Sequence, residues 1–116
     1  MRPLDIKLYK AQIISGKEDV AREWLAFLDA RKEESKRLLE NEKVYLEAYF
    51  PAMEGDTMFI YMLLVAKDID ATNATAREST DPFDLKHFEY GKECVEPELG
   101  AIVDCMFYME NLADLP

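Results

Sequence analysis

One uninterrupted apolar run, residues 58–66, constrains the fold of this chain more than any other feature. It is too short to cross a bilayer, which takes about 20 apolar residues. Glu54-Gly55-Asp56 precedes the run and Lys67-Asp68 follows it, as is typical of a short strand that is buried on both faces. Such a strand belongs inside a sheet, with other parts of the protein packed against each face.

The segments around this run alternate between strand and helix patterns. Strands are predicted at 6–14, 44–50, 58–66 and 101–109. Ser15-Gly16-Lys17-Glu18 fits a capping box that starts one long amphipathic helix, which ends near residue 41 or 43. A weak helix is expected up to about residue 79, and another follows Pro82 and ends at Glu96-Pro97. This order predicts a ferredoxin-like α+β fold, a four-stranded antiparallel sheet with its helices on one face, as a single domain over residues 1–116.

The chain is acidic, with a formal net charge of -10. Nucleic acids and anionic membranes bind basic surfaces, so neither is expected as a partner. The first residues lack the apolar stretch of a secretory signal, and the two cysteines, Cys94 and Cys105, lack metal-ligand spacing. We therefore expect a cytoplasmic protein with reduced thiols, without a metal and without a cofactor.

The side of the predicted sheet away from the helices, here called the open face, is strongly aromatic. Alternation of side chains along strands assigns to it Leu8, Lys10, Gln12, Tyr45, Glu47, Tyr49, Phe59, Tyr61, Leu63, Ile102, Asp104, Met106 and Tyr108. Such a patch is larger than soluble monomers usually expose, yet the charges of Lys10, Glu47 and Asp104 do not suit a dry core. The pattern predicts a homodimer in which two open faces meet and enclose a pocket for a small molecule. A slip of one residue in the first or last strand would exchange the two faces.

Several motifs along the chain carry a family resemblance. They are Ser15-Gly16-Lys17-Glu18 with Ala21-Arg22-Glu23-Trp24-Leu25, then Val44-Tyr45-Leu46-Glu47-Ala48-Tyr49-Phe50, and Asp81-Pro82-Phe83-Asp84 with His87. With these segments the chain resembles a small, uncharacterised bacterial family of ferredoxin-like domains in the dimeric α/β barrel superfamily. That superfamily includes cofactor-independent monooxygenases of the antibiotic-biosynthesis type, sugar mutarotases, haem-handling enzymes and ligand-sensing domains. The resemblance therefore implies the fold and the dimer, but not one reaction.

His87 and Glu47 are the predicted catalytic residues. His87 is the only histidine, and it can serve as a general acid or base oriented by Asp84 or Glu47. Alternatively, it is a boundary residue that packs at the edge of the sheet. Glu47 is either a base in the pocket or one half of an interface ion pair with Lys10 or Arg31.

Four further residues are predicted to contact a ligand. The hydroxyls of Tyr45 and Tyr61 are candidate donors, and Lys10 and Asp104 are candidate charged contacts, although tyrosines in such positions are also common in dimer interfaces. Two hypotheses about function stay open at this point. The protein is either a small cofactor-independent enzyme acting on a small organic molecule, or a non-catalytic domain for ligand binding or dimerisation.

Overall fold

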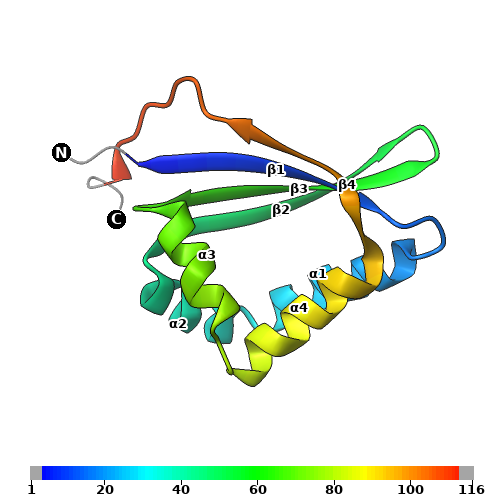
Figure 1. Cartoon of the computed structure of the whole chain (residues 1–116), viewed down its shortest axis with the longest axis horizontal. Helices are drawn as coiled ribbons and strands as arrows, with labels where there is room; N and C mark the ends of the chain where they lie inside the picture. The colour runs from blue at the N-terminus through cyan, green and yellow to red at the C-terminus, as the bar shows by residue number, and fades with distance from the viewer. Residues whose placement is uncertain (1–3, 113–116) are drawn as a thin grey trace.

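The computed structural model describes residues 4–112, which form one four-stranded sheet and four helices. In chain order the elements are β1 (Asp5–Ile13), α1 (Glu18–Ala30), α2 (Lys32–Glu42), β2 (Val44–Glu54), β3 (Thr57–Ala66), α3 (Ile69–Arg77), α4 (Pro82–Cys94) and β4 (Val95–Asp104). All strand pairs are antiparallel in the order β2-β3-β1-β4, and the helices cover one face of the sheet (Figure 1). The predicted ferredoxin-like fold is confirmed, with the apolar strand β3 inside the sheet. No helix in this range is long and apolar enough to span a membrane.

Several element boundaries differ from the prediction. The long first helix is divided at Arg31, whose φ of -111° and ψ of 31° are not helical, into α1 and α2. Strand β2 continues through Pro51, and β4 begins directly after α4 and contains Pro97. Both prolines lie in edge strands. An edge strand tolerates proline because its missing backbone N–H can face away from the neighbouring strand. The prediction that Pro51 ends its strand was wrong. The helix does end just before Glu96-Pro97, but the last strand begins at Val95 and not at residue 101.

The core lies between the sheet and the helices. Its larger cluster joins Ile13 and Ile60 of the central strands to Trp24 of α1 and to Tyr90 and Cys94 of α4. A smaller cluster lies where β2 and α3 begin and β3 ends, and it contains Val44, Leu64, Ala66 and Ile69. These buried residues fix the helix-facing side of β1 and β3, where the predicted assignment is confirmed.

Strand β2 has an extra residue that reverses its two faces. Val44 pairs with Ala66 and Leu46 with Val65, so β2 has one more residue than β3 over this step. This arrangement is a β-bulge. Beyond the bulge, Glu47 pairs with Leu64 and Tyr49 with Met62, which places both on the helix-facing side. The prediction that Glu47 and Tyr49 lie on the open face was therefore wrong.

The faces of β4 are also reversed relative to the prediction. Val103 pairs with Leu8 and so belongs to the open face, whereas Asp104 pairs with Lys7 and lies on the opposite side. The reason is that β4 starts directly at the end of α4, and its register against β1 shifts between Ala11 and Ile13. The strand ends at Asp104, so Cys105 lies after it and is exposed.

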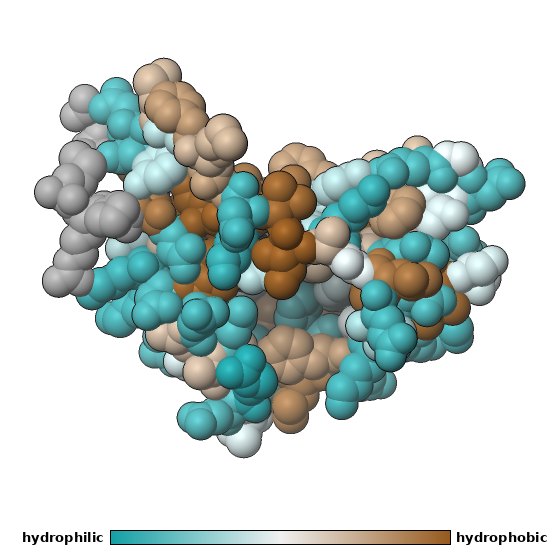
Figure 2. Space-filling model, turned by 45° about the horizontal axis from the view of Figure 1, so that its top comes forward, coloured by the Kyte–Doolittle hydropathy of each residue, from teal (hydrophilic) through white to brown (hydrophobic). Residues whose placement is uncertain are grey.

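The open face remains hydrophobic after these corrections. Lys10 and Tyr61 lie on it as predicted, and Lys10 Nζ stands 4.2 Å from the centre of the Phe59 ring. The reversed strands contribute exposed apolar side chains, namely Leu46, Phe50 and Val103. Figure 2, with the upper side of Figure 1 turned forward, shows hydrophobic surface gathered in the middle of this view.

Candidate functional site

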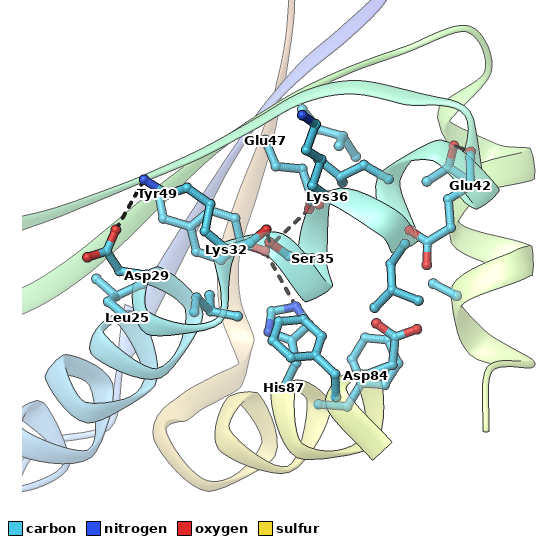
Figure 3. Close-up of a pocket in the computed structure, with 18 of the residues that line it drawn as sticks. Leu25, Asp29, Lys32, Ser35, Lys36, Glu42, Glu47, Tyr49, Asp84 and His87 are labelled. Carbon is cyan, nitrogen blue, oxygen red and sulfur yellow. Dashed lines mark hydrogen bonds and ion pairs between the residues drawn. The ribbon is translucent and has the colours of Figure 1, made fainter. Parts of the chain in front are cut away.

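A cavity of about 490 Å³ lies between the helices and the sheet. Its walls come from α1, α2, β2, β3, α3 and α4, so it is on the helix-facing side and not on the open face where the sequence pattern placed a pocket. The bulge in β2 is the cause, because it turns Glu47 and Tyr49 toward the helices. Figure 3 shows these two side chains above His87 and Asp84 of α4. The walls combine leucines and phenylalanines with several ionisable groups.

A chain of hydrogen bonds crosses the cavity wall, and we call it the relay (Trp24, His87, Tyr49 and Glu47). The indole Nε1–H of Trp24 donates to Nδ1 of His87 at 2.9 Å. The other ring nitrogen of His87, Nε2, lies 3.5 Å from the hydroxyl of Tyr49. That hydroxyl donates in turn to Oε1 of Glu47 at 3.4 Å (Figure 3).

The bond from Trp24 fixes the tautomer of His87. An indole N–H can only donate, so Nδ1 of His87 must keep its lone pair and the hydrogen of the neutral ring is on Nε2. Burial lowers the pKa of His87, although the nearby charge of Asp84 works in the opposite direction. His87 is therefore neutral at pH 7, and it presents an N–H donor rather than a basic nitrogen on the Tyr49 side.

Glu47 and Tyr49 lie at the other end of the relay. Glu47 belongs to an edge strand and is exposed as a residue, but its carboxyl end turns into the cavity toward Tyr49. Loss of water there raises the pKa of Glu47, while the hydrogen bond from Tyr49 lowers it and the charge of Asp84 raises it further. Burial and the nearby Glu47 raise the pKa of Tyr49 well above its ordinary value, so its hydroxyl keeps its proton.

Two more carboxyl groups line the same cavity. Asp84, in the first turn of α4, is only 5% exposed, and its Oδ2 atom has no hydrogen-bond partner within residues 4–112. Glu42, at the end of α2, has a pKa raised to about 7, first by burial and then by the charges of Asp84 and Glu47. Figure 3 shows the carboxyl groups of Asp84 and Glu42 pointing toward one another.

The structure brings together only some of the residues that the sequence nominated. His87 and Glu47 are joined through Tyr49, as the relay shows. Lys10 and Tyr61 lie instead on the open face, where Lys10 Nζ is 3.0 Å from Oε1 of Glu54 and the Tyr61 hydroxyl donates to the same carboxylate. This cluster is separate from the cavity.

Two other nominated residues are also outside the cavity. Tyr45 is part of the bulge and is exposed, and Asp104 ends the exposed edge strand β4. Conversely, the sequence pattern gave Tyr49 no role and did not single out Glu42. The position of Tyr49 depends on the bulge in β2, which no composition or spacing rule detects. Glu42 ends α2 before the bulge, and no sequence signal identified it.

Solved structures similar to this chain share its fold at low sequence identity. A protein from Bacteroides thetaiotaomicron, provisionally assigned as an antibiotic biosynthesis monooxygenase, is 18% identical with a TM-score of 0.61, covering 91% of this chain and 90% of its own. A dimeric protein of unknown function and ferredoxin-like fold from Bacteroides fragilis is 20% identical with a TM-score of 0.53, covering 90% and 96%.

A third similar structure has a described activity. A variant of SnoaB from Streptomyces nogalater, a cofactor-independent oxygenase, is 14% identical with a TM-score of 0.50, covering 93% of this chain and 98% of its own. No curated protein sequence matches the chain. The sequence model of a family of unknown function, DUF6176, matches residues 4–113. With nearly its whole length matched, the chain belongs to the DUF6176 family.

Proposed function

We propose that this protein is a small cofactor-independent enzyme that moves a proton on a carbonyl-bearing organic molecule bound in the cavity between helices and sheet. The observation that carries this proposal is the relay, in which a fixed N–H donor and a hydroxyl stand beside a carboxyl group of raised pKa. Donors beside a base suit reactions in which negative charge develops on an oxygen while a proton leaves. The fold shared with SnoaB, described as a cofactor-independent oxygenase, supports only that such a scaffold can serve an enzyme without a cofactor.

In the proposed step, the carboxylate of Glu47 takes a proton from the carbon next to the substrate carbonyl. The electron pair of that C–H bond forms a C=C bond, and the carbonyl oxygen becomes an enolate oxygen. The Nε2–H of His87 and the hydroxyl of Tyr49 donate to this oxygen. If Glu47 returns the proton to a different carbon, the substrate is isomerised. If the proton returns to the same carbon, the only net result is exchange of that hydrogen with solvent.

The length of the two relay contacts supports this reading. The Tyr49 hydroxyl is 3.4 Å from Glu47, beyond the usual 2.5–3.0 Å of an O–H···O bond, and 3.5 Å from His87, beyond the usual 2.7–3.2 Å of an N–H···O bond. Neither bond is therefore strong, so a substrate oxygen can compete for both donors. Glu47 is the proton acceptor rather than His87, because Trp24 holds His87 in the tautomer without a free lone pair toward Tyr49.

Isotope exchange tests the proposal without knowledge of the natural substrate. Hydrogen exchange of 2-tetralone, a small benzo-fused cyclic ketone, is followed by proton NMR in D2O with wild type, Glu47→Gln and Glu23→Gln. Glu23 is an exposed residue of α1 outside the cavity, so its variant is a matched control. We expect wild type and the control to accelerate exchange equally, and Glu47→Gln to lose about 10²–10⁴-fold of that rate. No acceleration by wild type, or an equal rate with Glu47→Gln, would favour the non-catalytic binding domain instead.

We also infer that the protein forms a homodimer through its open face. Leu46, Phe50 and Val103 are exposed apolar side chains on this face, and Figure 2 shows hydrophobic surface gathered there beyond what scattered single residues would give. Met106 in the segment after β4 is 100% exposed, and Phe107 and Met109 are also exposed, which favours their burial against a second chain. The similar protein from Bacteroides fragilis is described as dimeric, in agreement with this inference. The cavity lies on the opposite side of the sheet, so the dimer and the cavity are structurally independent.

A further inference from the structure

The cavity contains more negative charge than a single general base requires. Asp84, Glu42 and Glu47 come from three different elements, α4, α2 and β2, and all three line it. Within residues 4–112, no lysine or arginine forms an ion pair with any of these three carboxyl groups. The relay uses Glu47 alone, so it does not explain the other two.

Asp84 points most directly to a missing partner. Asp84 is only 5% exposed and lines the cavity. Its Oδ2 atom accepts no hydrogen bond from the described part of the chain. Buried carboxylate oxygens are normally paired or hydrogen-bonded, because an uncompensated buried charge is strongly destabilising. The first turn of α4 compensates only part of this cost through the helix dipole. A ligand that brings a donor with positive charge would compensate the rest.

We propose that the cavity takes a ligand with a protonated amine, whose N–H groups donate to Oδ2 of Asp84 between Glu42 and Glu47. This assignment rests on the proposed function and narrows it, since the carbonyl-bearing substrate then also carries an ammonium group. Leu28, Leu64 and Phe88 line the same cavity and form an apolar surface for the body of the ligand. An amine attached to a hydrocarbon or aromatic body matches both parts of the wall.

The charges around the site favour an ammonium group over other ligand groups. An anion would meet the three carboxyl groups, and the basic residues that line the cavity, Lys32 and Lys36, are both exposed. Lys32 is also paired with Asp29 at 3.4 Å. A metal ion is a poorer match, because no group of three or more His, Cys, Asp or Glu side chains in residues 4–112 is arranged to hold one. The net charge of -10 attracts cationic ligands in general.

Binding of an unreactive amine tests this inference separately from catalysis. Calorimetry at pH 8, where Glu42 is ionised, compares 2-phenylethylammonium with 2-phenylethanol, which has the same body and a neutral hydroxyl. We expect wild type to bind the amine at least tenfold more tightly than the alcohol. Asp84→Asn should lose this preference, while Glu23→Gln should keep it. Circular dichroism establishes whether each variant is folded. If Asp84→Asn does not fold, Glu42→Gln takes its place in the test, and we expect this variant to bind the amine several-fold more weakly than wild type.

Equal affinity for amine and alcohol, no binding of either, or an unchanged amine preference in Asp84→Asn would overturn the inference. None of these results touches the relay, because 2-phenylethylammonium has no carbonyl group and 2-tetralone has no amine. Exchange of 2-tetralone without amine binding would leave the proposed function in place and remove only the ammonium subsite. Amine binding without exchange would contradict the catalytic step, and the ligand class would then belong to a binding domain.

Discussion

At the scale of single residues, the cavity is defined by the unequal environments of its ionisable groups. Trp24 fixes His87 as a neutral donor, and burial with two neighbouring carboxylates raises the pKa of Glu42 to about 7. The sequence identified His87 because it is the only histidine, and Glu47 because it interrupts a strand pattern with a charge. The sequence assigned no role in the site to Trp24, since no sequence rule gives the direction of an indole N–H.

The raised pKa of Glu42 predicts a pH-dependent stability. The folded protein holds this proton up to about pH 7, whereas the unfolded chain loses it near 4.5, so the contribution of Glu42 to the free energy of unfolding falls as pH rises between these values. Glu42→Gln has no proton to lose, so this fall in the free energy of unfolding is absent from the variant. We expect urea unfolding to show that the difference in free energy of unfolding between the variant and wild type increases from pH 5 to pH 8. The increase should be roughly 1 kcal/mol in favour of the variant, after allowance for solvent screening.

A difference between variant and wild type is needed here because other groups titrate in the same range. Glu47 has a raised pKa and acts in the same direction, while His87 has a lowered pKa and costs stability as pH falls through its titration. Glu40→Gln, at an exposed position of the same helix, is the matched control and should show no such change. A constant difference between Glu42→Gln and wild type at all pH values would contradict the assigned environment of Glu42.

At the scale of elements, the order and type of strands and helices followed from the sequence, but two strand faces did not. Alternation correctly divided β1 and β3, where Ala11 and Ile13 on one strand and Met58 and Ile60 on the other are buried at alternate positions. It failed in β2, because a bulge shifts every later residue to the other side without changing the apolar pattern around it. It failed in β4 because that strand follows α4 without a loop.

The end of α2 offers a test at this scale. Lys43 lies between α2 and β2 in the left-handed conformation, with φ of 61° and ψ of 38°, which is strained for a residue with a Cβ atom. Lys43→Gly should relieve that strain and stabilise the protein by roughly 0.5–1 kcal/mol, seen as a higher Tm. Lys36→Gly, the same replacement inside α2, should instead destabilise it by about 1 kcal/mol. Two changes of the same sign would show that glycine acts only through the unfolded chain.

At the scale of the whole molecule, the sheet separates two surfaces with different tasks. The helix-facing side encloses the cavity, and the open face carries the apolar patch for which we infer a second subunit. The sequence predicted both a pocket and a dimer, but it placed them on the same face. The reversed faces of β2 account for the error, because they exchange Glu47 and Tyr49 for Leu46 and Phe50.

The inferred dimer is tested by one replacement on each side of the molecule. Phe50 on the open face and Leu85 on α4 are nearly equally exposed, at 53% and 52%. Wild type is expected to have twice the 13.4 kDa mass of one chain in light scattering at micromolar concentration. Phe50→Glu should shift it to the monomer mass, because a desolvated charge opposes association, and Leu85→Glu should remain dimeric. A monomeric wild type, or dissociation by Leu85→Glu alone, would rule out the open face as the interface.

The additional residue near the start of β2 also has an evolutionary consequence. Gain or loss of a single codon there swaps the chemical character of both sides of the strand at once, while its backbone pairing with β3 can be kept. Relatives that differ by one such insertion would therefore have different side chains lining the cavity and a different outer surface on the same scaffold.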